Sequence, residues 1–350
     1  MQSELQLSAD LAQQKNGLTG EFHFNTGAKT IVQVKQRRQV HTIELTPSTL
    51  NAGLDGEQLT GQMTLGLTGN DKGLAQFQLS TASQKLQGHL GLQMSDTAWL
   101  DPFLPEVSQL KGRVQADLNV AGQLNAPLLT GQVVVDQAGA KINPLGIVLK
   151  DVKLSAVAGG EQSERLQIQG SASSGKGSLQ LTGSVLMQPL AGWPTELSLT
   201  GKQFEVAKLP EAEINISPDL TFSQSGQQAT LNGALKIPYA KLTIKEVPKS
   251  AVVVSQDEVI LNQPKPEETK VMKTYGINST VNVELGDDVS FTGQGLKTQL
   301  TGALKIVSAQ ETLKVHGDVN MSKASYESYG QNLAVRKGRL IFNGPLIILG

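Results

Sequence analysis

The sequence contains no cysteine, few aromatic residues and almost no net charge. Cysteine is absent from its 350 residues, aromatic residues make up 4 %, and the formal net charge is −1. The lack of cysteine is compatible with an oxidising compartment of the cell envelope. A surface that binds nucleic acid needs an excess of basic residues, so the balanced charge argues against a nucleic-acid partner.

The sequence also lacks the segments that target or anchor a protein. No apolar run reaches the roughly 18 residues that a transmembrane helix needs. The first 14 residues carry Glu4 and Asp10, whereas a signal peptide has a basic start and an apolar centre. Because strand-like sequence surrounds Leu5 at one end and Leu346–Leu349 at the other, we interpret the chain as a piece of a longer protein. Its targeting or anchoring segment is then expected outside this sequence.

Signatures of catalysis are missing as well. The four histidines, His23, His41, His89 and His316, have no second histidine or cysteine at metal-ligand spacing, so we predict no metal site. No G-x-S-x-G nucleophile elbow occurs, and no G-x-G-x-x-G lies between a predicted strand and a predicted helix. We therefore expect no catalytic residue, no cofactor and no enzymatic activity.

The dominant positive signal is strict alternation of apolar and polar residues. It occurs in Arg113–Val120, in Val281–Leu285 and in Leu313–Met321, and turn-forming clusters such as Gly69–Asp71 separate such runs. The runs recur roughly every 8 to 14 residues along the chain, which predicts some two dozen short strands.

The tripeptide Leu-Thr-Gly recurs through the whole chain. It begins at Leu18, Leu59, Leu67, Leu129, Leu181, Leu199 and Leu300. The spacing is irregular and excludes a strict solenoid period. In the strand that is predicted to begin with the copy at Leu300, Gly302 lies on the same face as Leu304 and Ile306. Because glycine weakens a strand, its repeated place on the apolar face suggests that this face curves inward or leaves room for something else.

We divide the chain into five parts. Residues 1–94 and 112–244 are predicted to be repeated strands of a curled sheet, and 275–350 a third, truncated set of such strands. Residues 95–111 are predicted to be a short helical insertion, because Trp99 and Phe103 follow helical spacing. Residues 245–274 contain a Pro- and Glu-rich stretch and are predicted to be an exposed loop.

One-sided strands must bury their apolar faces. Few aromatic residues are present to fill a sandwich core, and helices that would cover an open sheet are nearly absent. We therefore predict an all-β protein: an elongated sheet curled along its length around an apolar interior groove. An aliphatic groove suits the acyl chains of phospholipids, whereas an open sheet edge suits an incoming β-strand of another protein. The residues predicted to line the groove are Met63, Leu65, Leu67, Leu118, Val120, Val133, Val135, Leu181, Val185, Leu235, Ile237, Val283, Leu285, Leu300, Leu304, Ile306, Val315 and Val319.

Several stretches resemble a known family. Leu110–Val114 and Val120–Gly131 resemble the repeats of AsmA-like proteins. The last third of the chain resembles the C-terminal domain of the TamB family. The segments that carry this second resemblance are Gly286–Gly293, Gly295–Leu296, Leu300–Gly302, Leu313–Gly317, Tyr326–Leu333 and Arg336–Pro345.

The resemblance implies a protein of the Gram-negative envelope, anchored in the inner membrane and crossing the periplasm. It implies a β-taco fold with an apolar interior, and an outer-membrane barrel protein, TamA, as partner. Two roles follow from it: transport of phospholipids between the inner and outer membranes, and assembly of outer-membrane β-barrel proteins. The family's chain continues into a segment that engages the barrel partner, and the ending at Leu346–Gly350 does not resemble it.

Overall fold

The computed structural model describes residues 5–14, 17–28, 30–36, 39–159, 164–244, 277–309, 312–328 and 330–345. In these residues, 20 strands form one large sheet and two more form a separate hairpin. Helix is almost absent, so the predicted all-β class and the curled sheet are confirmed. None of the helices in this described part is long and apolar enough to cross a membrane.

The strand bounds are close to those of the alternating runs in the sequence. The large sheet contains β1 (Leu5–Gln14), β2 (Gly17–Thr26), β5 (Thr49–Asp55), β6 (Gln58–Gly66), β7 (Lys72–Ser80), β8 (Lys85–Met94), β9 (Val107–Gln123), β10 (Ala126–Ile142), β11 (Ile147–Ala158), β12 (Arg165–Ser174), β13 (Gly177–Leu186), β14 (Thr195–Lys202), β15 (Phe204–Lys208), β16 (Ala212–Ser225), β17 (Gln228–Ile244), β18 (Ile277–Gly293), β19 (Leu296–Ala309), β20 (Thr312–Ser328), β21 (Gln331–Val335) and β22 (Gly338–Pro345). The hairpin contains β3 (Thr30–Gln36) and β4 (Gln39–Leu45), and short 3₁₀ helices are η1 (Ala98–Phe103), η2 (Asn143–Leu145) and η4 (Pro189–Ala191).

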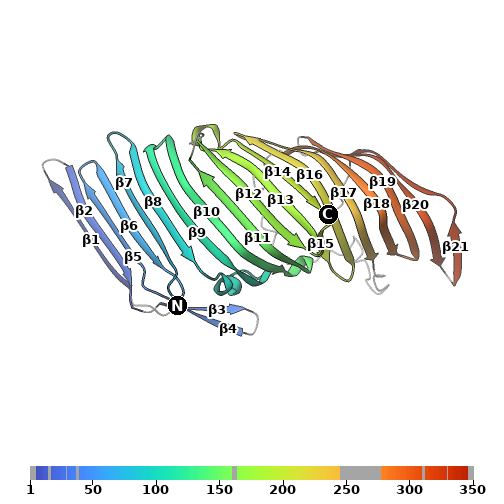
Figure 1. The fold of residues 1–350 in the computed structure, drawn as a ribbon, viewed down its shortest axis with the longest axis horizontal. Coiled ribbons are helices and arrows are strands. Elements are labelled where there is room, and N and C mark those ends of the chain that lie inside the picture. The colour runs from blue at the N-terminus through green and yellow to red at the C-terminus, as the bar shows by residue number, and fades with distance from the viewer. Residues whose placement is uncertain are drawn as a thin grey trace, which may run out of the picture.

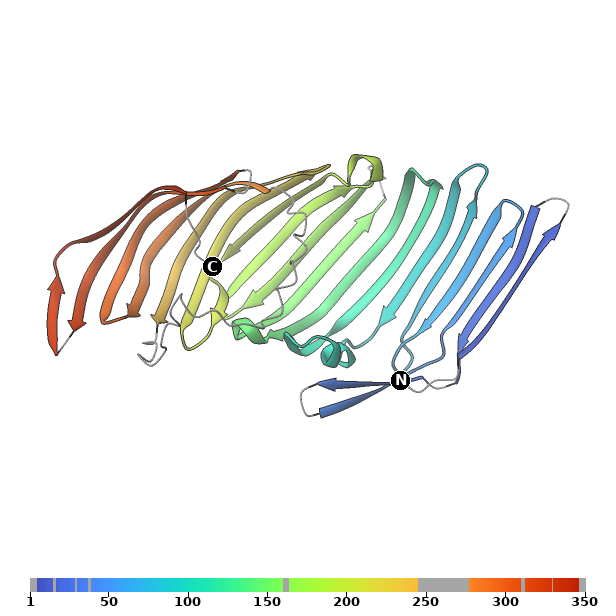
Figure 2. The same ribbon diagram turned by 180° about the vertical axis from the view of Figure 1, so that it is seen from behind.

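The strands follow one another along the long axis of the molecule, so the sheet is an extended meander (Figures 1 and 2). Neighbouring strands pair antiparallel along most of the sheet. One pair departs from this rule, because β17 and β18 run parallel, with Leu235 beside Val283. The β3–β4 hairpin leaves the sheet, and β2 pairs directly with β5.

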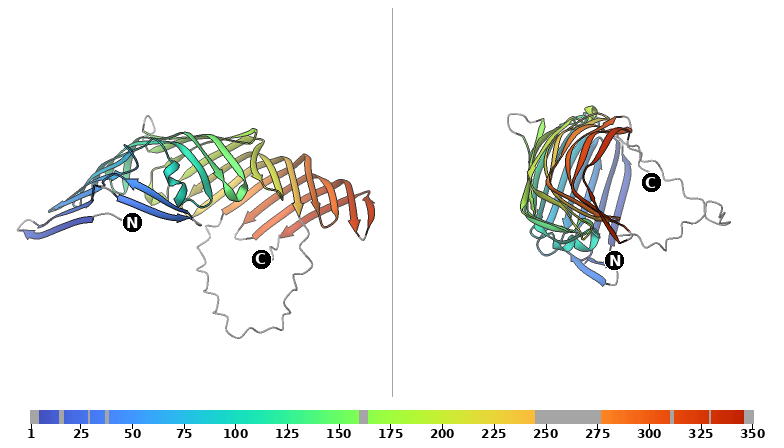
Figure 3. Two further views of the ribbon diagram at one scale, coloured as in Figure 1. Left: turned by 90° about the horizontal axis from the view of Figure 1, so that it is seen from below. Right: turned by 90° about the vertical axis from the view of Figure 1, so that its right-hand side faces the viewer.

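The sheet curls across its width, as the end-on view in Figure 3 shows. The pairing register shifts near one end of many consecutive strands, which marks β-bulges, and bulges bend a strand and increase its twist. Gln137, Asp151 and Lys323 adopt positive φ angles of 53°, 50° and 49° at such bulges in β10, β11 and β20. The shifts lie at Val135/Ala138, Ala138/Ala140, Asp136/Gly139, Gly139/Lys141, Lys150/Lys153, Glu205/Ala207, Asn215/Ser217, Ile237/Tyr239, Leu285/Ser290 and Lys297/Gln299.

The structure describes the predicted helical insertion at 95–111 but not the predicted loop at 245–274. Within 95–111 the structure forms η1 only at Ala98–Phe103, and β9 already begins at Val107. The helical part is shorter than predicted because Pro105 cannot continue the helix beyond Phe103, and the chain returns to the sheet at Val107. The predicted loop at 245–274 lies outside the described residues, as do Leu346–Gly350.

Candidate functional site

The large sheet has one apolar face, and residues paired across neighbouring strands share it. We call this the inner face and define it by the rows of cross-strand partners that contain Leu118 and Leu181. One row runs through Met63, Ala75, Leu90, Leu118, Gly131, Ala158, Leu166 and Val185. A second row runs through Val135, Leu154, Gly170, Leu181, Leu199, Leu220, Gly233, Val281, Ile306 and Val315.

The structure brings the predicted groove residues together on this face, with one departure. Leu67 follows the end of β6 and lies buried in the connection to β7, outside the rows. The residues that do lie on the inner face are Met63, Leu65, Leu118, Val120, Val133, Val135, Leu181, Val185, Leu235, Ile237, Val283, Leu285, Leu300, Leu304, Ile306, Val315 and Val319.

Most inner-face side chains are only half-buried, although they are large and apolar. Leu65 and Leu90 keep 41 % and 45 % of their surface exposed, whereas Val283 and Val319 near the other end keep 8 % and 6 %. Packed cores bury such residues almost completely. The curl therefore shields this face without filling it. The shielding does not persist to the C-terminal edge, because Leu340, the partner of Val319 on β22, keeps 45 % of its surface exposed.

Glycines on the inner face make room for larger neighbours. A Cβ atom on Gly61 would overlap the ring of Phe77, its partner on the next strand. Gly131 has φ +113°, and a Cβ there would overlap the carbonyl oxygen of Asp117. Both positions end a Leu-Thr-Gly copy, so the repeated tripeptide places glycine where neighbouring strands approach closely.

Charge is confined to the opposite, outer face. Away from the bulges, no Asp, Glu, Lys or Arg of the described strands lies on the inner face. Pairs on the outer face join neighbouring strands: Arg113 with Asp136 at 3.2 Å, Lys236 with Glu284 at 3.0 Å and Arg339 with Asp318 at 2.8 Å. The two faces thus differ sharply in polarity, as in a sheet that presents one face to water and the other to apolar material.

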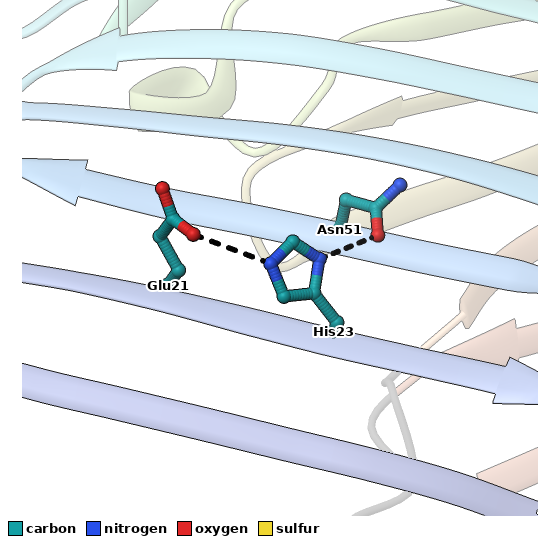
Figure 4. A network of polar contacts seen from close by, with 3 residues as sticks. All are labelled: Glu21, His23 and Asn51. Atoms are coloured by element: carbon teal, nitrogen blue, oxygen red, sulfur yellow. Dashed lines mark hydrogen bonds and ion pairs between the residues drawn. The ribbon is translucent and has the colours of Figure 1, made fainter.

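The outer face also carries a small polar network at the N-terminal end (Figure 4). His23 Nδ1 donates a hydrogen bond to Asn51 Oδ1 at 2.9 Å, and His23 Nε2 lies 3.4 Å from Glu21 Oε2. The bond to Asn51 and then that to Glu21 raise the pKa of His23 above its ordinary value. In the part of the chain that the structure describes, no three His, Asp or Glu side chains are placed to hold a metal ion.

Sequence reasoning missed several inner-face residues. Phe77 and Phe222 occupy the same rows as the predicted residues. The alternation of apolar and polar residues in Ala75–Leu79 was sufficient to predict that Phe77 lies on the inner face. Leu190 and Trp193, in the connection between β13 and β14, carry no periodic signal, because they lie in an irregular segment.

Comparison with known proteins adds three findings. The chain matches the family model of the TamB C-terminal domain over residues 165–348 and that of the TamB N-terminal domain over residues 1–135. It is 28 % identical over 309 residues to the "Translocation and assembly module subunit TamB" of Haemophilus influenzae, which covers 85 % of this chain. The chain spans 23 % of the length of that relative. No solved structure matches the chain.

Proposed function

Because the chain belongs to the TamB family, we propose that it forms part of a conduit that carries phospholipids across the periplasm between the inner and outer membranes. The acyl chains lie along the inner face, and the headgroups remain at the open side of the curled sheet. The observation that supports this proposal is the continuous apolar inner face, which is half-buried and, away from the bulges, carries no charged side chain in the described strands.

The energetics show why such a face is useful. Exposing a CH₂ group to water costs about 0.8 kcal/mol, so a lipid with two chains of about fifteen such groups meets a cost of roughly 24 kcal/mol. Unaided crossing of an aqueous gap is therefore too slow to be useful. An apolar surface that continues from strand to strand removes most of this cost at every point of the path.

Location and partners follow from the family as parts of the same proposal. The Haemophilus influenzae relative is named as a subunit of a translocation and assembly module. We place the protein in the Gram-negative envelope, with an inner-membrane anchor outside this chain and the outer-membrane barrel TamA as partner. The proposal assigns it transport or assembly rather than catalysis.

Photo-crosslinking tests the conduit directly. A photoreactive residue at Leu235 or Leu304, on the inner face, is expected to give adducts with phospholipid that mass spectrometry identifies. The same residue at Lys305, which pairs with Asn282 and His316 on the outer face, is the matched control. Equal lipid adducts from residues 304 and 305 would refute the conduit.

A second candidate is a binding module for assembly of outer-membrane β-barrel proteins. Both outer strands of the sheet favour it: in the described residues β1 pairs with β2 alone and β22 with β20 alone. Such edges offer unpaired backbone groups to an incoming strand. Strand-peptide capture without retained lipid would favour assembly over transport, and a proline at the β22 edge is expected to block capture.

A further inference from the structure

The connection between β13 and β14, at the upper edge of the sheet in Figure 1, is hydrogen-bonded to the neighbouring β16–β17 turn. We call residues 187–194, which contain η4, the rim loop. Gln224 Nε2 donates 2.9 Å hydrogen bonds to the carbonyl oxygens of Gly192 and Gly226. Gly226 N donates to the carbonyl oxygen of Ala191 at 3.1 Å. The rim loop is therefore fixed to the β16–β17 turn.

Despite this anchoring, the rim loop exposes two large apolar side chains. Leu190 keeps 85 % of its surface exposed and Trp193 keeps 42 %. Trp193 also has φ +59°, a left-handed conformation that is costly for a bulky residue. Backbone strain and exposed apolar surface are both unfavourable for stability, so folding alone does not account for these two side chains.

Leu190 and Trp193 line a pocket of about 930 Å³ that opens beside the rim. Phe222, Ala229 and Ile277 also line this pocket, and they lie on the inner face of β16, β17 and β18. The pocket is thus continuous with the apolar inner face. Its size lies within the range of about 300–1,000 Å³ that is common for small-molecule sites.

We propose that this rim pocket binds one acyl chain of a phospholipid at the edge of the groove. The inference rests on the proposed conduit, because it assigns a side site to the same lipid. Continuity with the inner face identifies the occupant as aliphatic. Polar side chains at the same opening, Gln227 and Ser225, suit the headgroup end of the lipid. The Trp193 ring is apolar but carries one polar N–H group, so it suits the boundary between the acyl chain and the headgroup of the lipid.

The test uses a photoreactive benzoylphenylalanine at position 190 or 193 of the protein, mixed with vesicles of phosphatidylethanolamine and phosphatidylglycerol. Both positions are expected to give phospholipid adducts. Ile341 is the matched control, since it is 70 % exposed and pairs with Asp318 on the outer face. The proposed lipid site would be refuted if position 341 gave as much lipid adduct as positions 190 and 193. It would also be refuted if positions 190 and 193 crosslinked only to other parts of the protein chain.

A second measurement separates this inference from the conduit. Lipid adducts at Leu304 without any at 190 or 193 would overturn the rim pocket and leave the conduit intact. Adducts at 190 and 193 without any at Leu304 would support the pocket and refute the conduit. Trp193→Asn keeps a residue that tolerates the left-handed backbone and removes the ring. In this variant, the yield of phospholipid adducts from a photoreactive residue at position 190 is expected to fall about tenfold. An unchanged yield would show that the Trp193 ring does not contribute to lipid binding.

Discussion

A charged residue on the inner face tests whether this face borders a groove or a packed core. Leu304 is the site of choice, because it is half-buried and lies between Val283 and Gly317 on the neighbouring strands. Leu304→Arg places a cation among aliphatic groups without altering the outer face. Gly317 has φ +127°, and a Cβ atom there would overlap the carbonyl oxygen of Ala303, so the two strands approach closely at this point.

The two structural interpretations differ greatly in the expected free energy of unfolding. In a closed core the isolated charge would cost tens of kcal/mol by Born solvation, well above the roughly 5–15 kcal/mol that stabilises a typical domain. At an open groove the guanidinium reaches water along its flexible stem. The loss is then mainly the apolar contact of Leu304, on the order of 1–2 kcal/mol.

The expected result is a folded variant that fails to carry lipid. Circular dichroism with heating measures the fold, and transfer of a fluorescent phospholipid, together with growth of an envelope-compromised strain, measures transport. Lys305→Arg on the outer face is expected to change neither readout. If Leu304→Arg unfolds the protein, Leu304 lies in a packed core. If the variant is folded and fully active, transport does not pass this point.

Two smaller perturbations test the local structure. Gly131→Ala is expected to destabilise the protein by at least about 1–2 kcal/mol in thermal denaturation, because its positive φ disfavours any side chain. Gly91→Ala, which meets only ordinary contacts, is expected to be silent, and equal effects would contradict the argument. His23 is expected to titrate above 6.5 by NMR, and Asn51→Ala is expected to lower its pKa; no change would contradict the assigned cause. Since the folded pKa is raised, this contribution to stability is present below pH 6.5 and is lost as the pH rises through the folded value.

Much of the fold was predictable because alternation has a direct physical cause. In Arg113–Val120 each apolar residue is followed by a polar one, and β9 forms there with its apolar side chains on the inner face. The grouping of Leu118, Leu181 and Leu304 on one face follows from the same pattern. Period two fixes which residues share a face, provided that the strands join the same sheet.

The sequence pattern did not reveal which strands pair with one another. Thr30–Leu45 alternates like the other runs, yet β3 and β4 form their own hairpin, because alternation does not determine the pairing partner. The bulges at Gln137 and Asp151 were also missed, since neither residue is a glycine that would signal positive φ. The parallel pairing of β17 with β18 depends on contacts distant in sequence, which local patterns do not encode.

The meander has a consequence for how the protein unfolds and how its length evolves. Each strand of the large sheet contacts mainly the strands beside it, so stability is close to a sum of strand and nearest-neighbour terms. Unfolding is then expected to begin at the outer strands and spread inward in steps, rather than in one cooperative transition. Adding or removing a pair of adjacent strands changes the reach of the molecule while preserving the alternation of its faces. A protein built in this way adjusts to a wider or narrower gap without redesigning a core.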